Sequence, residues 1–382
     1  MSGWDALRAR MVGDGVTRRF FAFRPVLTPS ARSLPSSTTC GRPTTAKTHS
    51  KRCDMMLRPL LVVAILAVSA AACLPQTTQT RAQSSQTPCT ANDPRVLCDP
   101  RALQTLGWAD SPYVTPDGNT LLMMYTPWNF WPTFTGGSPA KLGPDRPGHK
   151  SNANPWNDSN VYQSKRQQDG TWSSPVNLWF NDANGQCCAM VTSTGKVYFT
   201  KNIAGLGNQI FSAVPGSPAV SEDGVNSAAN DNNPWVSADD KMIFFESDRP
   251  GGFGGTDIWF SYRDASGNWV TPVNMGPAVN TAANETQPWA SGDGTALFFN
   301  REGVAGFPWA LWTGGQWVQQ SPLALDARYS AEISFNATMS SAYFAISDTT
   351  AQSILFVQSN RSATGWGPAA TTLRDCSCIR KQ

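Results

Sequence analysis

The sequence predicts an all-β fold, a five-bladed β-propeller of four-stranded antiparallel blades. Two observations support this: a recurring tryptophan and a recurring turn. Trp172, Trp269, Trp317 and Trp366 each stand shortly before a proline, at intervals of 97, 48 and 49 residues. The first interval is about twice the other two, so it contains one further unit. Self-similarity at this period is typical of a propeller, in which each repeat forms one sheet.

The recurring turn has the approximate pattern Pro-x-x-Ser/Thr-x-Asp-Gly. It occurs at 112–118 (PYVTPDG), 234–240 (PWVSADD) and 288–294 (PWASGDG), with weaker copies at 191–195 and 334–338. Asp followed by Gly suits the left-handed geometry of a tight hairpin turn. The five copies predict five units, centred near Asp117, Thr194, Asp239, Asp293 and Asn336.

Short apolar runs flank each turn and predict the strands. TLLMMY, KVYFT, KMIFFES and TALFFN are rich in β-branched and aromatic residues and are too short for helices. Outer strands and their turns follow, as in segments 161–178 and 257–275. Four strands per unit and five units predict a ring over 107–375 in which no sheet edge stays open.

The N-terminal part predicts export. Residues 55–73 (MMLRPLLVVAILAVSAAAC) have a charged start, an apolar run and small residues before Cys73. The run is too short to span a membrane and is typical of a bacterial secretion signal. Ala70 to Cys73 is similar to a lipobox, which predicts a lipid anchor on Cys73; the alternative is cleavage near Ala72 without lipid. Residues 1–54 are interpreted as an annotation overrun.

The charge balance differs between this leader and the rest of the chain. Residues 1–73 contain 11 Lys and Arg against 3 Asp and Glu, so 19 basic and 24 acidic side chains remain after Cys73. Without a basic stripe, nucleic-acid binding has no electrostatic basis. Residues 74–106 begin as a polar tether typical of flexible segments, and 376–382 form a short C-terminal tail.

Cysteine usage predicts an oxidising compartment. Six cysteines follow Cys73, and an even number in an exported chain favours disulfides. Bridges between the pairs on either side of the propeller would fasten the ends of the ring; these residues are Cys89, Cys98, Cys376 and Cys378. Metal binding by the four is the alternative. Cys187 and Cys188 are interpreted either as a disulfide between neighbours or as two buried thiols.

Propeller topology brings the segments that enter the inner strands to one mouth of the central channel. The insertion at 126–158 lies on the same face, and loops on a rigid frame are where function concentrates. The candidate catalytic acids there are Asp110, Glu285 and Glu332. The candidate ligand-binding residues are Trp128, Trp131, Trp156, Asp231, Asn233 and Gln287.

These residue types suit a carbohydrate, because aromatic rings stack on its C–H faces while amides and carboxylates bond its hydroxyls. Two carboxylates across a glycosidic bond could also hydrolyse it. The alternative roles for the acids are holding turns, binding water or coordinating a structural calcium ion. No cofactor is expected, and after Cys73 the only histidine is His149, which disfavours a multi-histidine metal site.

Segment 247–300, SDRPGGFGGTDIWFSYRDASGNWVTPVNMGPAVNTAANETQPWASGDGTALFFN, resembles the TolB-type, WD-like propeller repeat of bacterial envelope proteins. The resemblance extends with uneven strength over about 110–373 and is weakest in the second unit, where Thr194 replaces the turn aspartate.

Three functions follow from these observations. The first, which the resemblance favours, is a binding or scaffold module for a glycan or protein ligand at the cell envelope, periplasmic or extracellular, held to the membrane by lipid. The second is a glycoside hydrolase, and the third is a purely structural envelope component.

Overall fold

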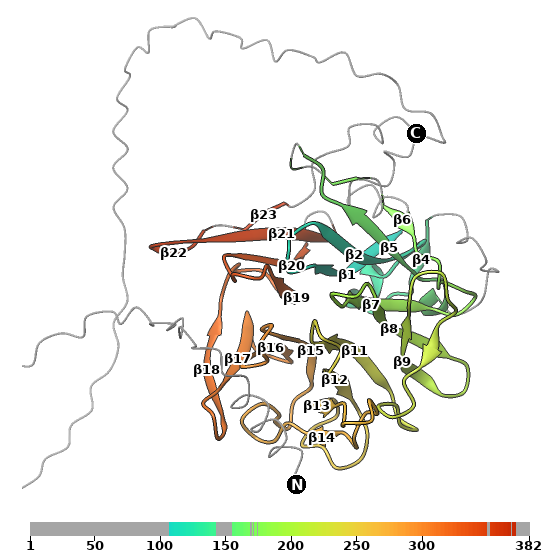
Figure 1. Cartoon of the computed structure of the whole chain (residues 1–382). Coiled ribbons are helices and arrows are strands. Elements are labelled where there is room, and N and C mark those ends of the chain that lie inside the picture. The colour runs from blue at the N-terminus through green and yellow to red at the C-terminus, as the bar shows by residue number, and fades with distance from the viewer. Residues whose placement is uncertain are drawn as a thin grey trace, which may run out of the picture. The chain divides into compact units, whose positions relative to one another are not determined.

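The described part of the chain, in a computed structural model, covers residues 107–142 and 155–371 except 169, 171, 174, 350, 351 and 368. Its strands form five sheets that follow one another around a central axis in chain order (Figure 1), which confirms the predicted propeller. From axis to rim, the first three blades are β1 (Trp108–Val114), β2 (Thr120–Thr126), β5 (Asn160–Lys165), β6 (Val176–Asn177); β7 (Gln186–Val191), β8 (Val197–Ile203), β9 (Gly207–Ala213), β10 (Val220–Ser221); and β11 (Asp231–Val236), β12 (Met242–Ser247), β13 (Asp257–Tyr262), β14 (Val273–Asn274).

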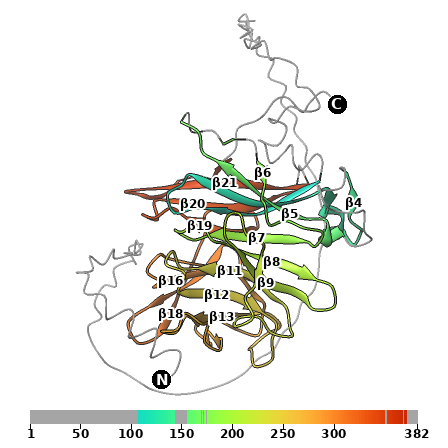
Figure 2. The same ribbon diagram turned by 45° about the vertical axis from the view of Figure 1, so that its right-hand side comes forward.

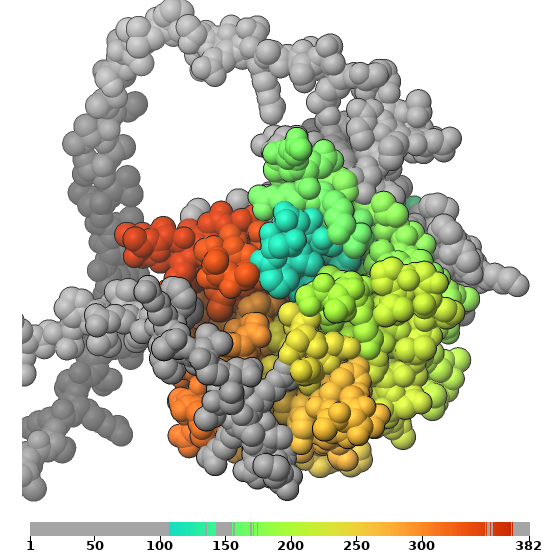
Figure 3. Space-filling view, viewed as in Figure 1, coloured from blue at the N-terminus to red at the C-terminus, as the bar shows by residue number. Residues whose placement is uncertain are grey.

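The last two blades follow the same order. They are β15 (Glu285–Ala290), β16 (Ala296–Arg301), β17 (Phe307–Trp312), β18 (Trp317–Leu323); and β19 (Ser330–Phe335), β20 (Ser341–Asp348), β21 (Ser353–Ser362), with β22 (Gly365–Trp366) and β23 (Ala370–Thr371) both paired to β21. The space-filling view shows the five coloured sectors around the centre (Figure 3).

The recurring turns close the innermost hairpins. In blade 4 the hydroxyl of Ser291 donates to Asp293 at 2.6 Å, and the Ser291 amide donates to Ala296 across the turn at 2.8 Å. Blade 2 makes the same turn without an aspartate, because the hydroxyls of Thr192 and Thr194 bond to each other at 3.0 Å. Hydroxyl and carboxylate groups that bond their own backbone stabilise such turns. The register of this unit is therefore kept.

Aromatic side chains fill the space between blades. Trp289 of blade 4 lies 4.8 Å from Phe335 of blade 5, and Phe298 stacks on Trp309 within blade 4 at 5.2 Å, measured between ring centroids. The recurring tryptophans lie in or against three hydrophobic clusters of the core, in agreement with a packing role. Such pairs stabilise a fold beyond the area that they bury.

The ring closes between the last blade and the first. Blade 5 lies beside blade 1 in both ribbon views (Figures 1 and 2), and β19 contacts β1. The amide of Val114 donates to the hydroxyl of Ser334 at 3.1 Å, and that of Ala337 donates to the carbonyl of Pro116 at 2.7 Å. The cysteines predicted to fasten the ring, Cys89, Cys98, Cys376 and Cys378, lie outside the described residues, as does Cys73.

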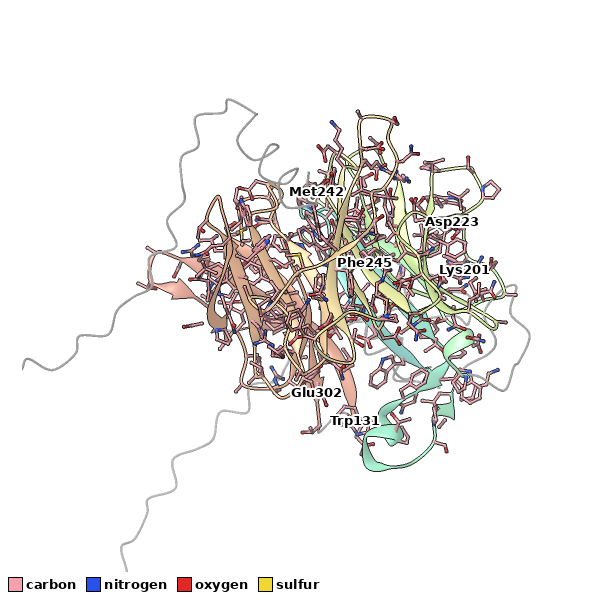
Figure 4. The ribbon with its side chains drawn as sticks, turned by 90° about the horizontal axis from the view of Figure 1, so that it is seen from below. Trp131, Lys201, Asp223, Met242, Phe245 and Glu302 are labelled. Atoms are coloured by element: carbon pink, nitrogen blue, oxygen red, sulfur yellow. A yellow bond between two sulfur atoms is a disulfide. The ribbon has the colours of Figure 1, made fainter. Side chains whose placement is uncertain are left out.

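The insertion of blade 1 adds a small layer to one face. It contains β3 (Trp128–Asn129), η2 (Trp131–Thr135), β4 (Ala140–Lys141) and η3 (Pro155–Asn157). Phe130 is buried and meets the edge of Trp108 at 6.2 Å. In Figure 4, Trp131 and Glu302 lie toward one side of the ring and Met242 toward the other, so the β2–β5 and β16–β17 connections share a face. Among the described residues, no helix is long and apolar enough to span a bilayer.

Candidate functional site

Each inner strand contains one β-bulge, and the five bulges surround the axis. The register of the inner hairpin shifts once in every blade. The residue at each shift has a positive φ between 48° and 59°, a conformation that non-glycine residues rarely adopt. These left-handed residues, one per blade, are Ser111, Cys188, Asn233, Gln287 and Glu332.

The bulges line a shallow hollow at the centre of the ring. Its empty volume is about 420 Å³, including open solvent at its mouth. Around it stand the side chains of the five left-handed residues, and beneath them lie largely buried apolar and aromatic groups, among them Tyr113, Met190, Trp235, Trp289 and Ile333. Polar groups above an aromatic floor are typical of a ligand site.

Three of the bulges are held by the second strand of the blade before them. The backbone amide of Asn233 donates to Thr200 Oγ1 at 3.0 Å, and that of Gln287 donates to Glu246 Oε2 at 2.7 Å. The amide of Glu332 donates to Asn300 Oδ1 at 3.2 Å. Because each bond joins two blades at the axis, the hollow is a rigid part of the propeller.

Asp110 and Glu332 meet where blades 1 and 5 join. The amide of Ser111 donates to both carboxyls, at 2.9 Å to Asp110 Oδ1 and 2.8 Å to Glu332 Oε2. Burial and the neighbouring Asp110, which also hydrogen bonds to it, raise the pKa of Glu332 well above its usual range. A second carboxylate nearby favours the neutral form of Glu332, because two like charges at this distance repel strongly.

Other side chains hold this acid pair in place. Gln287 Nε2 donates to Glu332 Oε1 at 3.2 Å, and Trp108 Nε1 donates to Asp110 Oδ2 at 3.1 Å. Tyr329, just before β19, is 64% exposed. Partial burial and the nearby carboxyls of Glu332 and Asp110 raise its pKa.

Glu246 is a third carboxyl near the axis, and the sequence analysis missed it. It is 6% exposed, accepts bonds from Asn232 Nδ2 at 2.9 Å and from the Gln287 amide, and forms no ion pair within the described residues. Burial raises its pKa. The available signal was a glutamate inside the apolar run KMIFFES, since a buried strand rarely contains an acid without a function for it.

Asp231 and Glu285 lie at the start of their strands and do not line the hollow. Both are completely buried, and each forms an ion pair with an arginine: Asp231 with Arg249, which follows β12, and Glu285 with Arg301 Nε, the last residue of β16, at 2.6 Å. The same arginines donate to the carbonyls of Val225 and Val279 at 2.8 Å. These two clamps fasten the connection that enters blades 3 and 4. Asn233 and Gln287, in contrast, do line the hollow.

Trp128 and Trp131 of the insertion lie away from the hollow. Trp128 and Trp131 are partly exposed and pack against a hydrophobic cluster of blade 1 that contains Trp108 and Phe130. Trp128 Nε1 donates to the buried Asp158 at 3.2 Å. Trp156 lies in η3. The structure thus brings Asp110, Asn233, Gln287 and Glu332 together and leaves Trp128 and Trp131 outside the hollow.

Cys187 and Cys188 stand at the bulge of blade 2. Their sulfur atoms are in contact and their Cα atoms are 3.8 Å apart, the arrangement of a disulfide between neighbouring residues. Cys188 Sγ lies 3.5 Å from Ser111 Oγ, across the junction of blades 1 and 2. Within the described ranges, no group of three or more His, Cys, Asp or Glu side chains is arranged to hold a metal ion.

Comparisons with known proteins find similarity to solved structures. No family model and no curated protein matches the sequence. TolB from Acinetobacter baumannii is 14% identical with a TM-score of 0.41, covering 69% of this chain and 54% of its own. A TolB from Agrobacterium tumefaciens is 12% identical with a TM-score of 0.43, over 70% of this chain and 81% of its own. This chain thus spans about half the length of the first.

An endo-1,4-β-xylanase from Bacteroides thetaiotaomicron is matched as well, at 11% identity and a TM-score of 0.42, over 70% of this chain and 95% of its own. The presence of TolB propellers among the matches is consistent with the TolB-like repeat predicted from the sequence. At these identities and TM-scores, the matches do not decide between binding and catalysis.

Proposed function

We propose that this chain is an exported, lipid-anchored propeller of the cell envelope that binds a glycan or a protein ligand at its central hollow, on the periplasmic or extracellular side. Export and anchoring are supported by the signal-like segment 55–73 and its Cys73. The contact between Cys187 and Cys188 supports the same compartment, because disulfides persist in oxidising surroundings.

The observation on which binding rests is the ring of bulge side chains. A left-handed residue in every blade directs five different side chains to one hollow, and three blades use hydrogen bonds between blades to fix it. Strain of this kind concentrates at functional sites, since holding a non-glycine residue there costs about 1–3 kcal/mol. A frame with no ligand would not need five such residues at one place.

The chemistry of the hollow favours a neutral, hydroxyl-rich ligand. Asn233 and Gln287 offer amide donors and acceptors, and the raised pKa of Glu332 favours its protonated form, which is both a donor and an acceptor. Sugar hydroxyls have the same dual character. A cationic protein side chain would bind instead by displacing the proton of Glu332, which provides a way to distinguish the two ligand classes.

The carboxyl geometry gives less support to the hydrolase alternative. Retaining glycosidases hold their two carboxyls about 5–5.5 Å apart and inverting enzymes about 6.5–9.5 Å apart, which leaves room for the bond that is cut. The Ser111 amide donates to both Asp110 and Glu332, which ties the two carboxyls to one backbone donor rather than setting them on either side of a sugar bond. Glu285, the third predicted catalytic residue, is engaged with Arg301.

The test is calorimetric titration of the full chain with a panel of furanose and pyranose oligosaccharides, together with an assay for released reducing ends. Gln287→Gly removes the side-chain amide and keeps the backbone amide. Glycine adopts the left-handed conformation at this position without strain. Gln352→Gly is the matched control. Gln352 is also a glutamine with a similar positive φ, but it is exposed in the turn before β21.

We expect Gln287→Gly to weaken binding about ten-fold, the loss of roughly one hydrogen bond, and Gln352→Gly to leave it unchanged. Equal weakening in both variants would place the ligand elsewhere. Release of reducing ends would favour the hydrolase. Binding of lysine-rich peptides with proton release, and of no glycan, would favour a protein partner.

A further inference from the structure

The bulge of blade 2 differs from the others in how it is held. On the second strand of each blade, one residue is paired with the residue before the bulge; these are Met124, Thr200, Glu246, Asn300 and Ala345. The three polar members are those that accept a bond from the bulge amide of the next blade. Met124 stands before the bulge of blade 2 and has only a weakly accepting thioether.

At the bulge of blade 2, the contact between the two sulfurs replaces the hydrogen bond that the bulge amides of blades 3, 4 and 5 donate to the blade before them. Cys188 has φ of +57°, so it needs support as the other bulge residues do. A bond from Cys188 to its neighbour Cys187 closes a small ring that restricts the backbone at the bulge. In blade 2, therefore, a covalent link between the sulfurs would do what a hydrogen bond between blades does elsewhere.

The same bulge contacts the acid pair through one residue. Cys188 Sγ lies 3.5 Å from the hydroxyl of Ser111, and the amide of Ser111 donates to both Asp110 and Glu332. Both cysteines are partly exposed, and Cys188 lines the hollow. A thiol reagent can reach them, and a change at Cys188 is passed directly to the groups that would bind a ligand.

We infer that Cys187 and Cys188 form a disulfide that acts as a redox latch on the hollow: the oxidised pair holds the bulge of blade 2 in its binding geometry, and reduction releases it. The reductant is a dithiol. Its two thiols become a disulfide while the bond between Cys187 and Cys188 breaks, and each cysteine sulfur ends with one proton. The effect on binding rests on the proposed function, whereas the change at the bulge does not.

Hydrogen exchange of the full chain, oxidised and after treatment with dithiothreitol, measures the bulge without any ligand. We expect reduction to raise exchange at least ten-fold in 186–190 and 109–113, and to leave the corresponding segment of blade 4, 285–290, unchanged. Mass analysis after alkylation reports whether Cys187 and Cys188 are bridged in the oxidised sample. Free thiols there, or equal exchange in both samples, would overturn the inference.

Two variants separate this pair from the other cysteines of the chain. Cys187→Ala with Cys188→Ala removes the link and keeps a side chain at the left-handed position, so it should exchange like the reduced protein in either state. Cys187→Ala with Cys188→Gly also removes the link, but glycine adopts the bulge conformation freely. It should exchange like the oxidised protein. A redox effect that persists in either variant would assign the latch to other cysteines.

The binding arm uses the oligosaccharide panel. If a glycan binds the oxidised chain, we expect reduction to weaken it about ten-fold, and the glycine variant to bind equally in both states. Unchanged affinity on reduction would contradict the latch even where the proposed function holds. If no glycan binds at all, the exchange experiment still decides the inference, so the two failures can be told apart.

Discussion

Glu285 and Gln287 lie two residues apart on β15 but have opposite surroundings. Glu285 is completely buried against Arg301, whereas Gln287 lines the central hollow. In a regular strand, residues two apart face the same side of the sheet. The bulge at Gln287 breaks that rule, and Asp231 and Asn233 on β11 repeat the pattern. The comparison teaches that the bulge decides the surroundings of these side chains. It leaves the acid before it buried in an ion pair and turns the amide side chain after it toward the hollow.

The largest effect should come from breaking a buried clamp. Arg301→Ala leaves the Glu285 carboxylate buried without its cation, which costs about 3–5 kcal/mol in similar pairs. Urea unfolding of the full chain measures this loss. Arg328→Ala is the control, because Arg328 is 45% exposed and pairs with Asp326 at the surface, so less than about 1 kcal/mol is expected. Similar losses in both variants would show that Glu285 does not depend on its clamp.

The bulge itself is tested by a β-branched residue. Gln287→Val places a branched side chain at φ of +55° and should lower the free energy of unfolding by about 1–3 kcal/mol. Thr286→Val, one residue earlier, lies outside the left-handed region and should change it by less than about 1 kcal/mol. If both variants unfold alike, the bulge stores no strain, and the explanation given for the opposite surroundings of Glu285 and Gln287 fails.

The sequence predicted the frame far better than the environment of each acid. Turn aspartates and apolar runs act locally, so they located all five inner hairpins. The ion pair of Glu285 needs Arg301, which lies sixteen residues later in the sequence. The two residues stand opposite each other only after β15 and β16 have paired, so the sequence alone does not show the contact. The bulges left one signal, a proline directly after the bulge residue in three blades, as in Asn233-Pro234, since proline within a strand marks a bulge.

A smaller effect is expected from the acid pair, and it depends on pH. The folded pKa of Glu332 is raised, so the folded state holds a proton that the unfolded chain releases near its ordinary value of about 4.3. Stability therefore falls as pH rises above that value toward the folded pKa, and stays lower beyond it. Glu332→Gln removes the titrating group while it can still accept from the Ser111 amide.

We expect Glu332→Gln to raise the free energy of unfolding by about 1 kcal/mol at pH 8 and to leave it unchanged at pH 3.5. Denaturant melts at the two pH values measure it. Asp110→Asn removes the neighbouring charge, lowers the pKa of Glu332 and should flatten the same profile. If the difference in the free energy of unfolding between wild type and Glu332→Gln did not change with pH, the pKa of Glu332 would not be raised in the folded protein.

The smallest effect should come from the insertion, where a partly exposed lysine lies at long range from the buried Asp158. Lys141 Nζ is 3.8 Å from Asp158 and 5.5 Å above the ring of Trp128, and its side chain is 25% exposed. Lys141→Met keeps the apolar stem and should lower the free energy of unfolding by only about 0.5–1 kcal/mol, and less at high salt. Melts in low and high salt measure this. If Lys141→Met lowered the free energy of unfolding as much as Arg301→Ala, the ion pair of Asp158 would stabilise the fold as the pairs of Asp231 and Glu285 do. The insertion would then be part of the rigid frame.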